Sequence, residues 1–353
     1  MKKLLSIILL VGLSSISYAG GVNSASDGNH NHASSAKASS GVHFYGRLYI
    51  GYDSTSGDVQ KLDDGGNKSR LGLKIRSGNI IGNLEYKFDI GDGTSGAGNN
   101  CGTNNENGCQ TFDMHIGNLG FITPLGYIGG GTYEAPYKTM GQFDTNMDTA
   151  IALNSHGGFS QGQGGIAGNF EGAIAYHAMM GPLEIEAMYA ASKGSNDVTN
   201  TDRGDYSVGI TAKDMFMNGL TFGFARYQDA ENSTISEKND KVFASFKAMP
   251  NMGIFVSLED LEVVNTFIAS SGTDGRISTY GIHYSMGMTD LQFVLADGDS
   301  SAAAANQDYS TSSISAKINL SKNSDITIGY TKQDFDADGS DVSTSGFGLT
   351  HKF

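Results

Sequence analysis

Hydrophobic and polar residues alternate along most of the chain from Val42 onward. In the stretch VHFYGRLYIGYD, Phe44, Leu48 and Ile50 share one parity. The opposite parity carries His43, Tyr45, Arg47, Tyr49 and Asp53. Successive side chains of a β-strand point to opposite sides, so a period of two predicts strands whose two faces meet different surroundings.

Sixteen segments carry this pattern. They span residues 42–53, 69–78, 82–91, 111–120, 125–132, 169–179, 182–191, 205–213, 219–228, 240–249, 253–262, 276–286, 289–297, 310–320, 324–333 and 344–353. Short turns alternate with long polar connections, which cover 54–68, 92–110, 133–168, 192–204, 229–239, 263–275, 298–309 and 334–343. This alternation is typical of an outer-membrane barrel with short periplasmic turns and long external loops. A soluble two-sheet sandwich, the alternative, gives no reason for it.

The two strand faces differ in chemistry throughout. One parity is rich in Leu, Ile, Phe and Tyr, and the other carries Arg, Lys, Glu, Asp, His, Ser and Thr. A closed barrel in lipid must present the apolar parity outward, so the charged parity is expected to face the lumen. We predict an all-β fold, a sixteen-stranded antiparallel transmembrane barrel wide enough for an aqueous channel.

The first residues, MKKLLSIILLVGLSSISYAG, have the composition of a targeting segment. Lys2 and Lys3 precede an apolar stretch from Leu4 to Leu13, and small residues follow as far as Ala19. The apolar stretch falls well short of the roughly 20 residues that a membrane-spanning helix needs, which disfavours an anchor. We predict a cleaved signal peptide over 1–19, a flexible leader over 20–41 and the barrel over 42–353.

Composition agrees with a barrel and restricts the partners. The chain has 49 Gly, 16 Tyr and 18 Phe but only 4 Pro, which suits many strands and turns. Its formal net charge is −14, and loss of Lys2 and Lys3 with the signal would make it −16 (−14 − 2). We therefore expect no nucleic-acid partner, and a mild attraction for cations.

Two cysteines, Cys101 and Cys109, enclose the polar segment CGTNNENGC. In an exported protein this pattern favours a disulfide, with free thiols and metal ligation as the alternatives. His30 and His32 lie in the leader, where we expect solvated side chains rather than a defined metal site. We predict no resident metal and no cofactor.

Three stretches resemble the general porins of Gram-negative bacteria, in particular the neisserial and proteobacterial porin superfamily. They are FYGRLYIGYD, SRLGLKIRSGNIIGNLEYKFDIGDG and the final GFGLTHKF. The resemblance covers the chain after residue 41. It implies a homotrimer of sixteen-stranded barrels in the outer membrane, with the third external loop folded into the channel. Those porins also usually carry a basic residue in the fifth strand, where this chain has Thr132.

The third long connection and the first strands are expected to bound the pore. The loop carries Glu134, Asp144 and Asp148. The facing basic residues are Arg47, Arg70, Lys74 and Arg76. Opposed charges across a narrow opening would create a transverse field that biases ion passage. Alternatively, the basic residues pair with Glu85 and Asp89 and only support the wall.

The final strand places Phe347, Leu349 and Phe353 on the lipid parity. It is expected to pair with the first strand, which leaves the barrel without an edge. The resemblance implies that this aromatic strand is also the signal recognised by the barrel assembly machinery.

From these features we expect the protein to form a weakly cation-preferring channel for the passive diffusion of ions and small hydrophilic solutes. The expected partners are a second and third copy of the chain, outer-membrane lipid and lipopolysaccharide. A substrate-selective channel and a surface adhesin on the same barrel are the alternatives. We predict no enzyme activity and no catalytic residues, because no acid that could orient the adjacent Ser155 and His156 is identifiable.

Overall fold

The computed structural model describes residues 40–56, 61–63, 69–88, 90, 112–146, 149, 151–160, 169–191, 204–228, 238–262, 275–300, 308–336 and 341–353. Its strands are β1 (Gly41–Thr55), β2 (Lys61–Asp63), β3 (Ser69–Ser77), β4 (Ile80–Phe88), β5 (Asp113–Thr123), β6 (Gly126–Glu134), β7 (Asn169–Met180), β8 (Leu183–Ala190), β9 (Tyr206–Lys213), β10 (Leu220–Gln228), β11 (Lys238–Met249), β12 (Met252–Leu261), β13 (Gly275–Met286), β14 (Thr289–Ser300), β15 (Tyr309–Asn319), β16 (Ser324–Phe335) and β17 (Val342–Lys352). The helices are α1 (Pro136–Thr139) and a 3₁₀ turn, η1 (Leu153–Ser155).

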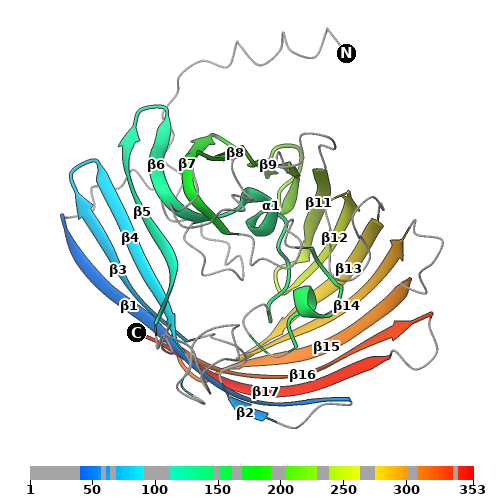
Figure 1. Ribbon diagram of the computed structural model, residues 1–353. Coiled ribbons are helices and arrows are strands. Elements are labelled where there is room, and N and C mark those ends of the chain that lie inside the picture. Colours follow the sequence, from blue (N-terminus) through cyan, green and yellow to red (C-terminus); the bar gives the residue numbers. More distant parts are fainter. Residues whose placement is uncertain are drawn as a thin grey trace, which may run out of the picture.

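Sixteen long strands form one closed antiparallel barrel, as the alternation predicts (Figure 1). Each predicted strand coincides with an observed one, within a few residues at the ends. The additional strand β2 lies inside the predicted first long connection, where Leu62 pairs with Tyr52 of β1. The third connection also starts later than expected, because β6 runs to Glu134.

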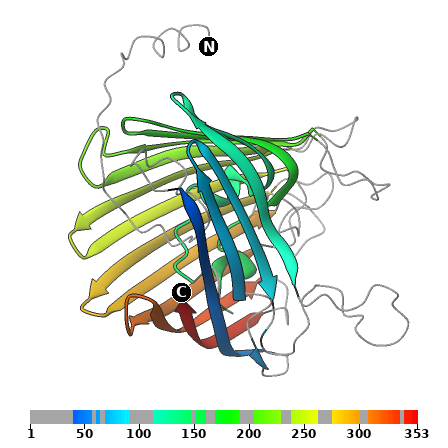
Figure 2. The same ribbon diagram turned by 90° about the vertical axis from the view of Figure 1, so that its left-hand side faces the viewer.

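The barrel closes between its first and last strands. β1 pairs with β17 from Arg47 opposite Lys352 to Thr55 opposite Thr344. Beyond that ladder, the Gly46 and Phe353 backbones exchange two hydrogen bonds of 3.0 and 3.1 Å. Figure 2 shows the near-wall strands crossing those of the far wall at a large angle, as strand tilt in a barrel requires.

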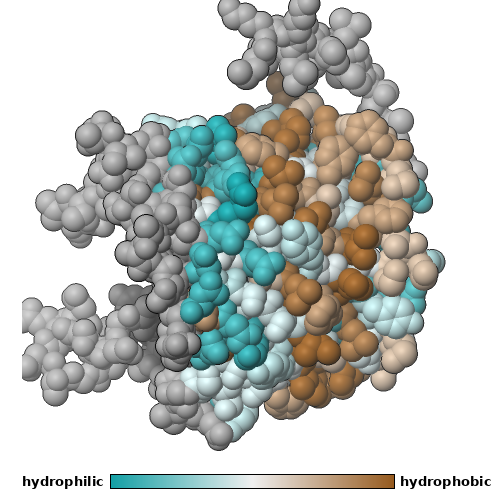
Figure 3. All heavy atoms as spheres, turned by 90° about the vertical axis from the view of Figure 1, so that its right-hand side faces the viewer, coloured by the Kyte–Doolittle hydropathy of each residue, from teal (hydrophilic) through white to brown (hydrophobic). Residues whose placement is uncertain are grey.

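The apolar parity faces outward. On β1, Phe44 is 65% exposed, whereas Tyr49 on the opposite parity is 2% exposed. Figure 3 shows a broad apolar band on one side of the barrel, bordered by hydrophilic residues. No helix in the described part of the chain is long and apolar enough to cross a membrane.

The prediction that charges face the lumen is wrong for two cross-strand pairs. The Arg226 guanidinium donates to both carboxylate oxygens of Asp240, at 2.6 and 2.7 Å. The Arg276 guanidinium donates to Asp260 at 2.8 Å. All four residues lie on the outward parity, because their neighbours Ala225, Lys241, Glu259 and Ile277 are the buried ones. They sit near strand ends that lead into long connections, where an outward charge can stay close to the membrane surface.

The described ladder is irregular at three places: one lies between Phe246 and Met249 on β11, and the other two are bulges close to the third connection. His115 is an extra residue on β5, because Met114 pairs with Tyr86 while Ile116 pairs with Glu85. The ladder between β6 and β7 shifts in the same way between Gly131 and Tyr133. A bulge re-aims the side chain at the insertion. Both bulges lie where the third connection enters the lumen.

Candidate functional site

The described part of the third connection lies inside the barrel and begins with the single-turn helix α1 (Figure 1). Pro136 occupies the first helical turn, where its missing N–H costs no hydrogen bond. The Tyr137 N–H donates to Ser207 Oγ at 3.0 Å, and the Tyr137 hydroxyl donates to Glu259 Oε2 at 2.7 Å. Lys241 Nζ donates to the Tyr137 carbonyl at 2.5 Å and lies 4.5 Å from the ring centroid. Tyr137 is thereby held at its backbone, ring and hydroxyl.

Glu259 also receives the far part of the loop. Its Oε1 accepts a hydrogen bond of 3.2 Å from the Ser160 N–H, so one carboxylate joins residues 137 and 160 to the wall. Glu259 and Lys241 are opposite each other on β12 and β11, and both are fully buried. Burial, and then the nearby Glu259 carboxylate, raise the pKa of Tyr137, so its hydroxyl remains a donor.

The middle of the loop is braced by Asp144. Its Oδ1 accepts the Asn146 N–H at 2.8 Å, and its Oδ2 accepts the Leu153 N–H at 2.7 Å. Gln292 of β14 accepts from the Thr145 hydroxyl at 2.6 Å and from the Asn146 amide at 3.1 Å. The Asp144 carboxylate therefore shapes the loop, and the Gln292 side-chain amide fastens the loop to β14.

The returning half is fastened to the last strands. His156 Nε2 lies 3.0 Å from the Thr344 hydroxyl of β17, and the Thr311 hydroxyl donates to the His156 carbonyl at 2.7 Å. Tyr309 of β15 donates to the Gly157 carbonyl at 2.8 Å. Gly157 has a φ of +74°, a conformation that favours glycine. Burial lowers the pKa of the His156 imidazole, so the ring stays neutral at pH 7.

Apolar contacts complete the attachment. The aromatic rings of Phe143 and Phe159 from the loop pack against Phe255 of β12, with centroid separations of 4.9 and 6.4 Å. A larger buried cluster joins the start of the loop to the wall, and includes Tyr133, Tyr137, Met140, Phe170, Tyr227, Phe243, Leu261, Ile277 and Tyr309. These apolar contacts thus extend along the wall from β6 to β15.

The remaining wall carries a row of four basic residues. In the strand register, Lys352 of β17 lies opposite Arg47 of β1, Arg47 lies opposite Arg70 of β3, and Arg70 lies opposite Lys87 of β4. All four lie on the lumen parity. Adjacent like charges repel, so such a row requires nearby anions.

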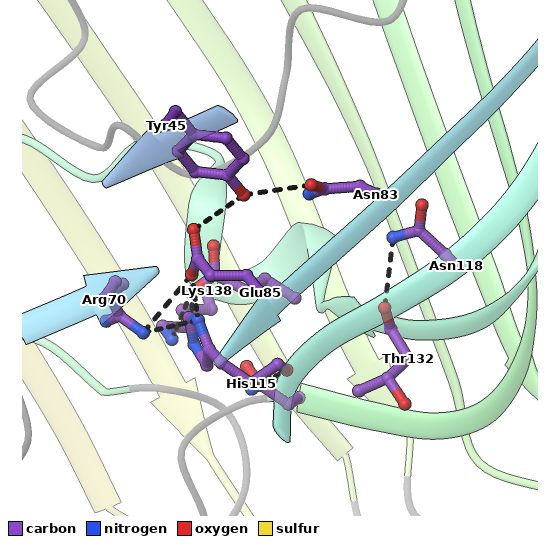
Figure 4. A network of polar contacts seen from close by, with 10 residues as sticks. Tyr45, Arg70, Asn83, Glu85, His115, Asn118, Thr132 and Lys138 are labelled. Carbon is purple, nitrogen blue, oxygen red and sulfur yellow. Dashed lines mark hydrogen bonds and ion pairs between the residues drawn. The ribbon is translucent and has the colours of Figure 1, made fainter. Parts of the chain in front are cut away.

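Figure 4 shows where one such anion lies. Glu85 Oε1 is 3.5 Å from Arg70 Nη1 and 2.6 Å from His115 Nδ1, and His115 also contacts Arg70 directly. His115 Nε2 reaches Glu134 Oε1 at 3.8 Å, and Glu134 bonds Lys138 of α1 at 2.6 Å. The bulged histidine therefore links the basic row to the entry of the loop.

The structure brings some predicted site residues together and separates others. Arg47 and Arg70 are adjacent, whereas Lys74 lies 4.8 Å above the Tyr45 ring and Arg76 lies beside the turn at Gly78. Glu134 lies near Arg70 through His115, rather than across an opening from it. Asp144 is 1% exposed and bonded within the loop. Their role in a constriction stays a prediction.

Other predicted residues lie at the surface or outside the described residues. The side chains of Phe347, Leu349 and Phe353 are exposed on the outward face. Asp148, Cys101, Cys109 and the predicted signal and leader up to residue 39 fall outside the described residues.

Sequence reasoning missed the residues that hold the loop. Lys241 and Glu259 lie on the lumen parity of adjacent strands, and that parity was the available signal. Their convergence on Tyr137 depends on contacts more than 100 positions apart in the chain. Thr132 stands where a basic residue was expected by resemblance, and its carbonyl accepts a hydrogen bond of 3.2 Å from the Asn118 side-chain amide.

A closed sixteen-stranded barrel with an apolar outer band and a loop fastened inside a charged lumen defines a transmembrane channel protein. The family model for the Gram-negative porins matches residues 31–353. The chain belongs to that family and is an outer-membrane channel protein. No protein of curated function matches its sequence.

Solved structures share the fold at low sequence identity. An anion-selective porin from Comamonas acidovorans is similar with a TM-score of 0.66 and 16% identity, covering 89% of this chain and 100% of that chain. The outer-membrane channel DcaP of Acinetobacter baumannii is similar with a TM-score of 0.62 and 14% identity, covering 90% of this chain and 99% of that chain. OmpT of Vibrio cholerae, described as a trimer form, is similar with a TM-score of 0.61 and 13% identity, covering 90% of this chain and 100% of that chain.

Proposed function

We propose that the barrel lets ions and small hydrophilic solutes diffuse passively through a water-filled lumen that the third loop narrows. One observation carries the proposal: Glu259 bonds the loop at Tyr137 and Ser160, which keeps the loop inside the barrel. A loop fastened in this way narrows the cross-section of the pore and does not move to close it. The charged lumen wall supports passage of polar rather than apolar solutes.

The constriction is proposed to lie between the loop and the basic row that contains Arg47 and Arg70. Glu85 and Glu134 offset part of that row through His115, so the transverse field is weaker than four basic residues alone would give. The overall excess of 37 acidic over 23 basic residues supports a weak preference for cations. The basic row locally favours anions instead. A reversal-potential measurement would decide which of the two effects prevails.

The proposed assembly is a homotrimer in contact with outer-membrane lipid and lipopolysaccharide, inserted by the barrel assembly machinery. The trimer form described for OmpT of Vibrio cholerae supports the first part. The outward pair of Arg276 and Asp260, near the end of the barrel that carries the long connections, offers charges of both signs to lipid headgroups. We propose no catalytic activity in addition to the channel role.

Liposome swelling with neutral sugars of graded size tests the function. The expected result is uptake that falls with solute size and does not saturate. Saturable uptake of one sugar would replace the proposal with a substrate-selective channel. Absence of uptake by correctly folded protein would favour an adhesin on the same barrel.

A further inference from the structure

Three side chains of metal-ligating types lie together on the lumen wall formed by β7 and β8. His177 lies on β7 directly opposite Glu186 on β8, and Glu184 is two residues away on the same face. One donor atom from each side chain lies within 4.8 Å of the other two. The turn at Gly181 and Pro182 joins these strands, and as a short turn it belongs to the periplasmic rim.

The spacing of the donors suits a small cation. His177 Nε2 lies 3.2 Å from Glu184 Oε1 and 3.7 Å from Glu186 Oε1. Zn²⁺ binds imidazole nitrogen and carboxylate oxygen at about 2.0–2.2 Å, so neighbouring donors of a tetrahedral site lie about 3.3 Å apart. A small rotation of one carboxylate would complete three corners, with the fourth left for water from the lumen.

One hydrogen bond accounts for only part of the cluster. His177 Nε2 lies within hydrogen-bond distance of Glu184 Oε1 at 3.2 Å, whereas Glu186 Oε1, at 3.7 Å, lies beyond that distance. The other ring nitrogen, Nδ1, is buried and has no hydrogen-bond partner in the described residues. His177 is only 7% exposed, so this arrangement is not a freely solvated histidine. Nδ1 can hold the ring proton, which leaves the Nε2 lone pair directed at the carboxylates.

One cation already lies nearby. Lys213 Nζ bonds Glu184 Oε2 at 2.7 Å, on the oxygen that does not approach the histidine. The lysine side chain is 47% exposed and offsets one of the two carboxylate charges. The lysine weakens the attraction of the two carboxylates for a further cation but leaves Glu184 Oε1 and Glu186 Oε1 beside His177 Nε2.

We propose that His177, Glu184 and Glu186 bind a divalent transition cation of the zinc type at the periplasmic mouth of the pore. One imidazole with two carboxylates favours zinc and its neighbours over Ca²⁺ and Mg²⁺, which prefer oxygen donors alone. A bound divalent cation would add positive charge to this wall and oppose cation flow past it. The binding site itself does not depend on the proposed conduction.

Equilibrium dialysis of the folded barrel against ZnCl₂, with metal measured by mass spectrometry, tests the site. The background is a variant with His30→Asn and His32→Asn, because the leader histidines could bind zinc themselves. We expect one Zn²⁺ per chain, with affinity about 10-fold or more lower after His177→Asn or Glu186→Gln, as loss of a ligand implies. His283→Asn, a lumen histidine that stacks on Phe255, is the matched control and should bind normally.

Two further results decide the proposal. Lys213→Met should tighten zinc binding, since it removes a competing cation, and CaCl₂ should not displace the bound metal. Equal zinc binding before and after both His177→Asn and Glu186→Gln would overturn the site. So would weaker binding in Lys213→Met. Heat-dependent gel mobility confirms that each variant is folded, and the dialysis result stands whether or not the barrel conducts.

Discussion

Lys241 and Glu259 lie directly opposite each other on β11 and β12, and both are completely buried beneath the third loop. Lys241 donates to the Tyr137 carbonyl and Glu259 accepts from the Tyr137 hydroxyl. Opposite charges on the wall thus hold one loop residue from two sides. Burying two ionisable groups is costly unless each is compensated; here each charge offsets the other, and the loop adds hydrogen bonds to both.

Removal of one member of this pair should loosen the loop. We expect Glu259→Gln or Lys241→Met alone to lower the free energy of unfolding by about 3–5 kcal/mol, because each leaves the other group buried without its counterpart. The double variant should cost less than the sum. Urea unfolding of all four proteins in detergent gives the coupling energy. Strict additivity would show that the two residues act independently.

Arg70 should influence ion selectivity because it lies in the basic row on the lumen parity. Arg70→Gln removes one fixed positive charge from that wall and should shift the reversal potential toward cations. The control is Arg276→Gln, which removes an outward-facing arginine whose side chain is 62% exposed. Planar bilayers under a KCl gradient provide the measurement. Equal shifts in both variants would contradict a pore-facing role for Arg70.

Acidification should weaken attachment of the returning half of the loop. Burial lowers the pKa of His156, so the folded protein favours the neutral ring. The resulting stability is present above the ordinary histidine pKa of about 6.5 and is lost as the pH falls below it. The ring contacts uncharged groups, Ala152 O and the Thr344 hydroxyl, which offer no countercharge.

We therefore expect more current noise and brief closures at pH 5 than at pH 7.5, and a smaller pH effect in His156→Gln. The control is His351→Gln, an exposed histidine that bonds Ser324. Single-channel recording at the two pH values checks the expectation. An unchanged pH effect in His156→Gln would reject this histidine as the cause.

Barrel closure should depend on the absence of a side chain at Gly46. A Cβ placed there would lie 2.3 Å from Phe353 Cζ and 2.9 Å from the Arg70 carbonyl oxygen. Gly46→Val should therefore displace the last residue and reduce the folded fraction seen by heat-dependent gel mobility. Gly41→Val is the control, because nothing lies within 4 Å of its Cβ position. A normal folded yield for Gly46→Val would contradict the proposed tight closure.

The strands were predictable because each repeats one physical constraint, apolar outside and polar inside, over ten or so residues. The lumen-facing contacts were not. Parity places Glu259 in the lumen, but the meeting with Tyr137 joins positions 122 apart in the chain. The bulge at His115 has no signature in the alternation, and it turns this side chain into the link between Arg70 and Glu134.

Asp144 shows a second limit of sequence reasoning. Asp144 was expected at the pore because the resemblance implies that the third external loop, which carries it, folds into the channel. In the structure it accepts two backbone N–H groups and is buried, so the loop uses it as an internal brace. Loop geometry depends on where backbone donors meet, and residue type alone does not reveal that.

Single-channel conductance of the purified, folded chain in a planar bilayer is the direct test of diffusion through a lumen narrowed by a fastened loop. We expect stable ohmic steps, closures in groups of three for the proposed trimer, and greater open-channel noise in Glu259→Gln, where the loop loses its principal attachment. Silent bilayers from correctly folded protein would contradict the channel role. Steps whose size and noise are identical in the wild type and Glu259→Gln would contradict narrowing by a fastened loop.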